Sequence, residues 1–208
     1  MALAMVSVPA AHGGVVLGVV PLATAGAAAL VAHERPSPGF WATSIVGAGI
    51  VIAFVLSQSE ARTFALGDLY LFGTVLAGAF GYALSGRLSM SMPGWEVISW
   101  QVAAFLPFSA GMAFFFRSHD FANVPLTAWV GLGYVSLVSQ FFAFFVFNAA
   151  MAMSGVARVG QLMLLQPFVI IALAALVNGE PVRLATLAYA AGVVATVLIS
   201  QRMPIKRK

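Results

Sequence analysis

Seven long apolar segments are the feature that most constrains the fold of this chain. A transmembrane helix needs roughly 20 apolar residues to cross a hydrocarbon core about 30 Å thick. Because no water is available at that depth, the backbone must satisfy its own hydrogen bonds, which favours helices. The sequence therefore predicts an all-α polytopic membrane protein with an N-terminal helical stub at 1–11. The seven predicted spans are 13–32, 40–57, 67–86, 95–116, 127–150, 159–177 and 184–201.

Composition and charge support a membrane protein. Hydrophobic residues make up 62% of the chain and charged residues 8%, against about 25% charged in soluble domains. The net charge of +4 would favour nucleic acid in a soluble protein, but here the basic residues lie in short loops and in the tail 202–208. We therefore expect the lipid bilayer as a partner and no nucleic acid. No Lys or Arg precedes Arg35, so no cleaved leader is predicted.

The loop charges also predict an orientation. If the tail is cytoplasmic, alternation of the spans places seven basic residues inside and three outside, which agrees with the positive-inside rule. We expect a multi-pass protein of the inner (plasma) membrane with a cytoplasmic C-terminus. The outer residues are Arg62, Arg117 and Arg183, and the inner residues are Arg35, Arg87, Arg158, Arg202, Lys206, Arg207 and Lys208.

An internal repeat relates the stretch 15–58 to the stretch 161–201. Pro21 and Glu34 match Pro167 and Glu180 at one common offset, and the second helix of each stretch ends in Ser-Gln. An odd number of predicted spans separates the two glutamate turns, so the copies are inverted in the membrane. Inverted repeats are typical of secondary transporters, whose substrate path lies between the halves near the midplane. Duplication in a structural membrane protein is the less favoured alternative.

The residues around the repeat resemble the EamA-type permeases of the drug/metabolite transporter superfamily. The resemblance rests on Pro21 with the motif HERP at 33–36, on LQP at 165–167 with NGEP at 178–181, and on the helix 67–84. It implies a secondary transporter or exporter of small metabolites or organic compounds, amino-acid-like or drug-like, that works by alternating access. The predicted divisions are 1–58 as the end of a first repeat, 59–66 as a loop, 67–201 as a second repeat and 202–208 as a basic tail.

The chain departs from that family in length. Such permeases usually have ten spans in two five-helix repeats, and the repeat offset places Met1 opposite Phe147, late in the third helix of the second repeat. The first repeat is therefore expected to be incomplete. A misassigned start, a truncated gene, or a short form that completes its bundle as a homodimer or with another permease chain would each account for this. The alternative function is a non-transporting remnant or a helper subunit.

Polar residues within the spans are the candidates for a substrate path. Gln140 and Asn148 are eight residues apart, which in an α-helix places them on one side. Amides also serve helix packing, and Trp or Tyr also serve as interfacial belts, so both alternatives stay open. The candidates are Gln140, Asn148, Gln161, Gln166, Trp100, Tyr82 and Thr24.

The prolines and glutamates of the repeat have separate predicted roles. Pro21 and Pro167 are predicted helix breaks, because proline removes one backbone donor and frees the carbonyl four residues earlier. Each kink either lines a cavity or only fits the helix to its neighbours. Glu34 and Glu180 are expected to have structural roles at turns, since a carboxylate at a helix C-terminus is unfavourable unless it caps another helix or pairs with a base.

No enzyme signature is present. The chain has no cysteine, no P-loop and no metalloprotease motif, and His12, His33 and His119 all lie near predicted span ends. No catalytic residue, metal or cofactor is therefore expected. Small residues at 44, 48, 49 and 53 and at 188, 192 and 196 predict close helix packing, within the chain or between chains.

Overall fold

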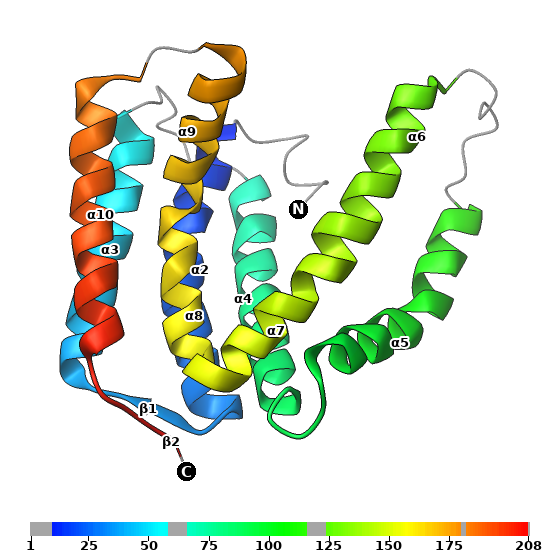
Figure 1. Cartoon of the computed structure of the whole chain (residues 1–208), viewed down its shortest axis with the longest axis horizontal. Helices are drawn as coiled ribbons and strands as arrows, with labels where there is room; N and C mark the ends of the chain where they lie inside the picture. Colours follow the sequence, from blue (N-terminus) through cyan, green and yellow to red (C-terminus); the bar gives the residue numbers. More distant parts are fainter. Residues whose placement is uncertain (1–9, 58–65, 116–123, 180–181, 208) are drawn as a thin grey trace. The chain divides into compact units, whose positions relative to one another are not determined.

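A computed structural model describes residues 10–57, 66–115, 124–179 and 182–207, and nearly all of them are helical (Figure 1). The elements are α2 (Ala10–Val31), β1 (Glu34–Pro36), α3 (Pro38–Ser57), α4 (Leu66–Leu88), α5 (Gly94–Phe115), α6 (Leu126–Gly133), the π-helix η2 (Tyr134–Phe142), α7 (Ala143–Ser154), α8 (Val156–Leu162), the 3₁₀ turn η3 (Met163–Leu165), α9 (Gln166–Asn178), α10 (Leu184–Arg202) and β2 (Ile205–Arg207).

Six helical segments are long and apolar enough to cross a membrane. They are Pro38–Ser57, Leu69–Leu88, Gly94–Phe115, Leu126–Ser154, Val156–Val177 and Leu184–Arg202. The remaining predicted span, 13–32, corresponds to α2, of which Gly18–Val31 is a shorter apolar helix. The predicted polytopic helical fold is confirmed. The predicted stub at 1–11 lies outside the described residues except for its last two.

The chain divides into two compact units. The first combines residues 1–84 with 154–208, and the second is 85–153. The first unit therefore contains both copies of the internal repeat, whereas the second contains the helices that precede the second copy.

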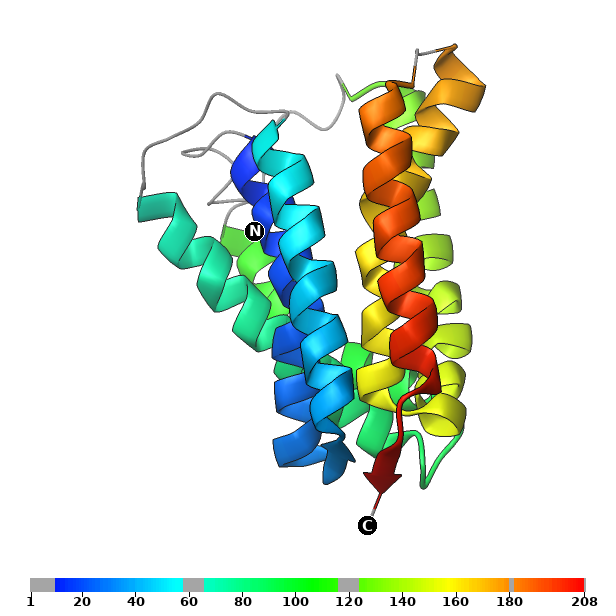
Figure 2. The same ribbon diagram turned by 90° about the vertical axis from the view of Figure 1, so that its left-hand side faces the viewer.

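Antiparallel pairs of repeat-related helices build the first unit. α2 packs against α8, and α3 packs against α10, while α2 and α3 also contact each other. Figures 1 and 2 both show α3 beside α10, running in opposite directions. This is the arrangement that inverted copies of one helix pair adopt when they pack together.

A glycine allows α3 to approach its neighbours closely. A Cβ on Gly47 would lie 2.8 Å from Leu164 Cδ1 and 2.9 Å from Thr196 Oγ1, so α3 touches both η3 and α10 there. A buried apolar cluster surrounds this contact. Its members are Val51, Phe54, Val55, Leu164, Val193 and Val197. Close packing of α3 with α10 therefore occurs within the chain between Thr196, which is among the predicted small residues, and Gly47, which is not. At the predicted Gly49, nothing lies within 4 Å of an added Cβ.

A two-stranded ladder closes one end of the first unit. β1 pairs antiparallel with β2, with Glu34 opposite Arg207, Arg35 opposite Lys206 and Pro36 opposite Ile205. The amide of Ser37 also donates to the carbonyl of Pro204 at 3.2 Å. The sequence predicts a turn and a tail at these positions and no pairing between them, because neither segment carries a strand pattern long enough to detect.

The second unit contains a long helical segment with a π-helical section. α6, η2 and α7 follow one another without a break from Leu126 to Ser154. Asn148 Nδ2 donates to the carbonyl of Gly94 at 3.1 Å, which joins α7 to the start of α5. A Cβ on Gly94 would lie 2.8 Å from the Phe145 carbonyl oxygen, so glycine permits this contact.

Candidate functional site

The two repeat prolines occupy matching positions in their spans. Pro21 is the twelfth of the 22 residues of α2, and Pro167 is the twelfth of the 22 residues of the span Val156–Val177. Both therefore lie close to the middle of a membrane-length segment. At Pro167 the helix is interrupted, because η3 separates α8 from α9 and Pro167 lies in the first turn of α9. At Pro21 the α-helix α2 continues without a change. Of the two predicted breaks, only the one at Pro167 therefore coincides with a change of helix type.

Thr24 and Gln161 are buried polar residues on two helices in contact. Each side chain is 1% exposed. Neither Thr24 Oγ1 nor Gln161 Nε2 has a hydrogen-bond partner within the part of the chain that the structure describes. A Cβ on Gly160, the neighbour of Gln161, would lie 3.1 Å from Thr24 Cγ2, which places Thr24 against this turn of α8. A buried polar group without a partner costs about 1–3 kcal/mol, so these two groups are candidates for an additional ligand.

Glu34 joins the two repeat copies at one end of the first unit. Its carboxylate is 3% exposed and accepts the backbone N–H of Val156 at 2.8 Å and of Ala157 at 2.9 Å. These are orphan donors at the start of α8, so Glu34 acts as a cap supplied from another part of the chain. The predicted structural role is consistent with this contact, although the capped helix lies in the other repeat copy.

Arg158 and Gln201 extend this contact region. Arg158 Nη2 donates to the carbonyl of Met203 at 3.0 Å, and Gln201 Nε2 donates to the carbonyl of Arg158 at 2.9 Å. Arg158 Nε is buried and lacks a partner among the residues described. The chain segment after α10 is therefore held against the start of α8. The sequence singles out Gln201 through the repeat match and Arg158 as an inner basic residue, but it does not predict the contact between them.

The other predicted path residues belong to both units: Tyr82 and Gln166 to the first, and Trp100, Gln140 and Asn148 to the second. Gln140 in η2, Trp100 in α5 and Gln166 in α9 are exposed, and Tyr82 in α4 is half-buried. Asn148 is fully buried, with Oδ1 unpartnered among the described residues. The two residues therefore differ in exposure, and their common side along the helix stays a prediction. Glu180 lies outside the described residues.

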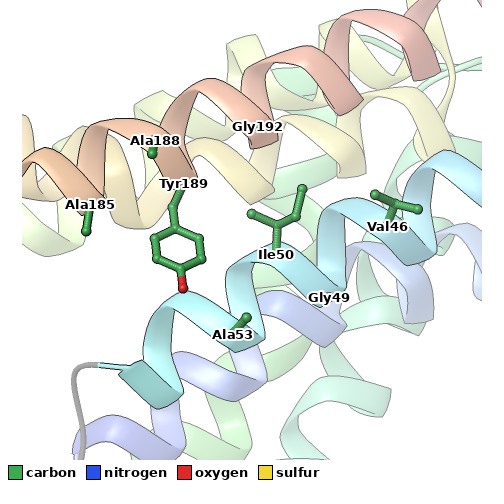
Figure 3. Close-up of a pocket in the computed structure, with 8 residues that line it drawn as sticks. All are labelled: Val46, Gly49, Ile50, Ala53, Ala185, Ala188, Tyr189 and Gly192. Atoms are coloured by element: carbon green, nitrogen blue, oxygen red, sulfur yellow. The ribbon is translucent and has the colours of Figure 1, made fainter.

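An apolar groove lies between α3 and α10 (Figure 3). Its volume is about 550 Å³, and the Tyr189 hydroxyl is the one polar side-chain group in the lining. The figure shows that ring extending from α10 toward α3. Small side chains leave this space open. The lining residues are Val46, Gly49, Ile50, Ala53, Ala185, Ala188, Tyr189 and Gly192. Such a lining suits apolar chains and offers little to a polar substrate.

Comparison with known proteins identifies the family. The model of the EamA-like transporter family matches residues 65–201. The chain belongs to this family. An uncharacterized transporter of Bacillus subtilis (strain 168), YdeK, is 37% identical over 201 residues, which cover 97% of this chain and 70% of the relative. The EamA-family chain is therefore a multi-pass membrane protein of a small-molecule transporter family.

A solved structure supports the fold of this EamA-family chain. A protein of known crystal structure, 19% identical in sequence, superposes with a TM-score of 0.76 over 95% of this chain and 69% of its own length. At this identity the match supports the architecture and not a substrate.

Proposed function

We propose that this EamA-family chain is a secondary transporter or exporter of small metabolites or organic compounds, amino-acid-like or drug-like, across the inner membrane. In this proposal it works by alternating access, with the C-terminus in the cytoplasm. The observation that carries the proposal is the matched placement of Pro21 and Pro167 at the middle of two inverted spans, with polar groups nearby that have no partner among the described residues. Interrupted helices at the midplane are where secondary transporters bind substrate.

Thr24 and Gln161 are the groups that we assign to the substrate. Thr24 lies within one helical turn of Pro21, and Gln161 lies on the segment that ends at the η3 break. A hydroxyl can donate or accept a hydrogen bond, and an amide nitrogen donates. Together they suit a substrate with an acceptor, such as a carbonyl or carboxylate, on an apolar body. The exposed Gln166 directly precedes Pro167 and is the third residue that we place along the path.

Alternating access also requires that one end of the first unit opens. The contacts at the Glu34 end join segments from both repeat copies, namely β1, the start of α8 and the tail after α10. In the proposed cycle these bonds form in the state closed at that end and break in the state open there. The Glu34 cap and the ladder then act as a closure whose free energy sets the balance between the two states.

Flux measurements in proteoliposomes that contain this chain test the proposal. The panel would comprise labelled amino acids and amphipathic organic cations and anions. Thr24→Val replaces a hydroxyl by a methyl group of similar size, and Gln161→Leu removes the amide. We expect each variant to reduce flux at least tenfold while folding is retained, because the substrate loses one hydrogen bond in a buried site, which is worth about 1.4 kcal/mol or more.

Thr196→Val is the matched control. Thr196 is also buried, but its hydroxyl already donates to the carbonyl of Val193 at 2.8 Å. Its flux should stay near that of the wild type. Full flux in both Thr24→Val and Gln161→Leu would exclude the assigned contacts. If the wild type moves no compound of the panel, the non-transporting or helper alternative is favoured instead.

A further inference from the structure

The strand pair at the end of the first unit places two cations directly opposite each other. Arg35 of β1 and Lys206 of β2 are partners in the antiparallel register. Directly opposed residues of such a pair project from the same face. Both side chains are exposed, whereas Glu34 is buried and Pro36 and Ile205 are half-buried. The ladder therefore has an inner face that packs on the protein and an outer face that carries two positive charges.

Like charges at directly opposed positions destabilise a strand pair. The ladder has only three residues per strand, and two-stranded ribbons of this size are marginal in water. Glu34 is the nearest carboxylate in the sequence, but it is turned to the N–H groups of α8. Within the residues that the structure describes, no carboxylate is paired with Arg35 or Lys206. The outer face is thus an anion site that the described part of the protein does not fill.

The position of the ladder indicates which anion is available. β1 is followed after one residue by α3, and β2 follows α10 after two residues, and both helices are membrane spans. The ladder consequently lies where these spans leave the hydrocarbon, at the level of the lipid headgroups. Arg202, exposed in the last turn of α10, adds a third cation to the same connection.

We propose that Arg35, Lys206 and Arg202 form a docking surface for an anionic phospholipid headgroup, which we name the basic ladder surface. A headgroup phosphate between Arg35 and Lys206 replaces their repulsion with two charge-assisted contacts, and the guanidinium of Arg35 can bind two phosphate oxygens at once. The bound lipid stabilises the pairing of β1 with β2, and through it the connection between α3 and α10. Anionic lipids are abundant in the cytoplasmic leaflet, where basic segments next to spans attract them.

Hydrogen exchange of the full chain in nanodiscs tests this proposal without a transport assay, so its outcome is independent of the proposed function. The readout is the exchange rate of the peptides that cover 33–37 and 203–207, in phosphatidylcholine discs with and without phosphatidylglycerol. We expect phosphatidylglycerol to slow exchange in both peptides severalfold. An unchanged rate would overturn the proposal, as would equal slowing by inorganic phosphate in discs of phosphatidylcholine alone.

Charge variants distinguish lipid binding at the basic ladder surface from a general effect of membrane charge. In Arg35→Gln/Lys206→Gln, exchange should already be slow in phosphatidylcholine and should no longer respond to phosphatidylglycerol. Lys206→Glu places an anion opposite Arg35 within the protein, so it should also slow exchange without anionic lipid. Arg183→Gln removes one exposed cation at the opposite end of α10 and should keep the full lipid response. A lipid response in the double variant equal to that of the wild type, or its loss in Arg183→Gln, would contradict the proposal.

Discussion

The carboxylate of Glu34 accepts a hydrogen bond from the backbone N–H of Val156, 122 residues later in the chain, at 2.8 Å. The next amide, that of Ala157, donates to the other carboxylate oxygen at 2.9 Å. The turn between α2 and α3 therefore caps a helix of the other repeat copy. One side chain thus connects the two copies at the end where the C-terminal strand also pairs.

Glu34→Ala should lower the free energy of unfolding by about 2–3 kcal/mol, because two buried N–H groups lose a charged acceptor. Glu34→Gln retains one acceptor oxygen and should lose about half as much. The measurement is reversible unfolding in mixed micelles. Glu96→Ala is the control, since Glu96 lies in the first turn of α5 and is only partly buried. This substitution should lower the free energy of unfolding by about 0.3–1 kcal/mol. Equal losses for Glu34→Ala and Glu96→Ala would contradict the capping role.

Gly155→Ala should also destabilise the start of α8. Gly155 has φ 98° and ψ 149°, a backbone conformation that is nearly restricted to glycine, so alanine there costs about 1–3 kcal/mol. Because the same backbone presents Val156 and Ala157 to Glu34, the loss in Glu34→Ala/Gly155→Ala should be smaller than the sum of the single losses. Unfolding of the four proteins of this cycle provides the test. Strict additivity would show that the turn and the cap act independently.

Gly47→Ala and Gly49→Ala should have different effects on the free energy of unfolding. The added methyl group at 47 meets Thr196 Oγ1 at 2.9 Å, and Thr196 is held by its bond to Val193, so overpacking should cost about 1–3 kcal/mol. At 49 nothing lies within 4 Å of the added Cβ. Alanine at 49 should be neutral or should stabilise α3 by up to about 1 kcal/mol through helix propensity. Thermal unfolding in detergent compares them, and a loss of stability in Gly49→Ala as large as in Gly47→Ala would rule out this account of the α3 and α10 contact.

Thr24→Val should raise the free energy of unfolding by about 1–2 kcal/mol, because it removes a buried hydroxyl that has no partner in the described residues. Thr196→Val should lower it by about 1 kcal/mol, since its hydroxyl is hydrogen-bonded. If Thr24→Val is more stable than the wild type and also has reduced flux, the Thr24 hydroxyl serves substrate binding and lowers the stability of the protein. A destabilised Thr24→Val would instead indicate that the hydroxyl serves packing.

Much of the architecture follows from local properties of the sequence. Each predicted span agrees with an observed helix to within about four residues at its ends, because an apolar stretch of sufficient length must be helical in a bilayer. The break next to Pro167 is local too, since proline cannot donate to the preceding turn. The π-helix at Tyr134–Phe142 has no such signal in the sequence, since nothing in the local residue pattern distinguishes it from an α-helix.

The repeat with Pro21, Glu34, Pro167 and Glu180 was determined by the sequence alone, and so were the class of protein and the family that it resembles. Tertiary structure decided which polar and charged groups meet. Glu34 accepts the N–H of Val156, and Arg35 lies opposite Lys206 in the ladder, while Thr24 Oγ1 and Gln161 Nε2 have no partner among the described residues. The physical reason is that hydropathy and helix breaking depend on neighbours in the chain. A hydrogen bond or a charge contact depends instead on which segments, up to 122 residues apart here, are packed side by side.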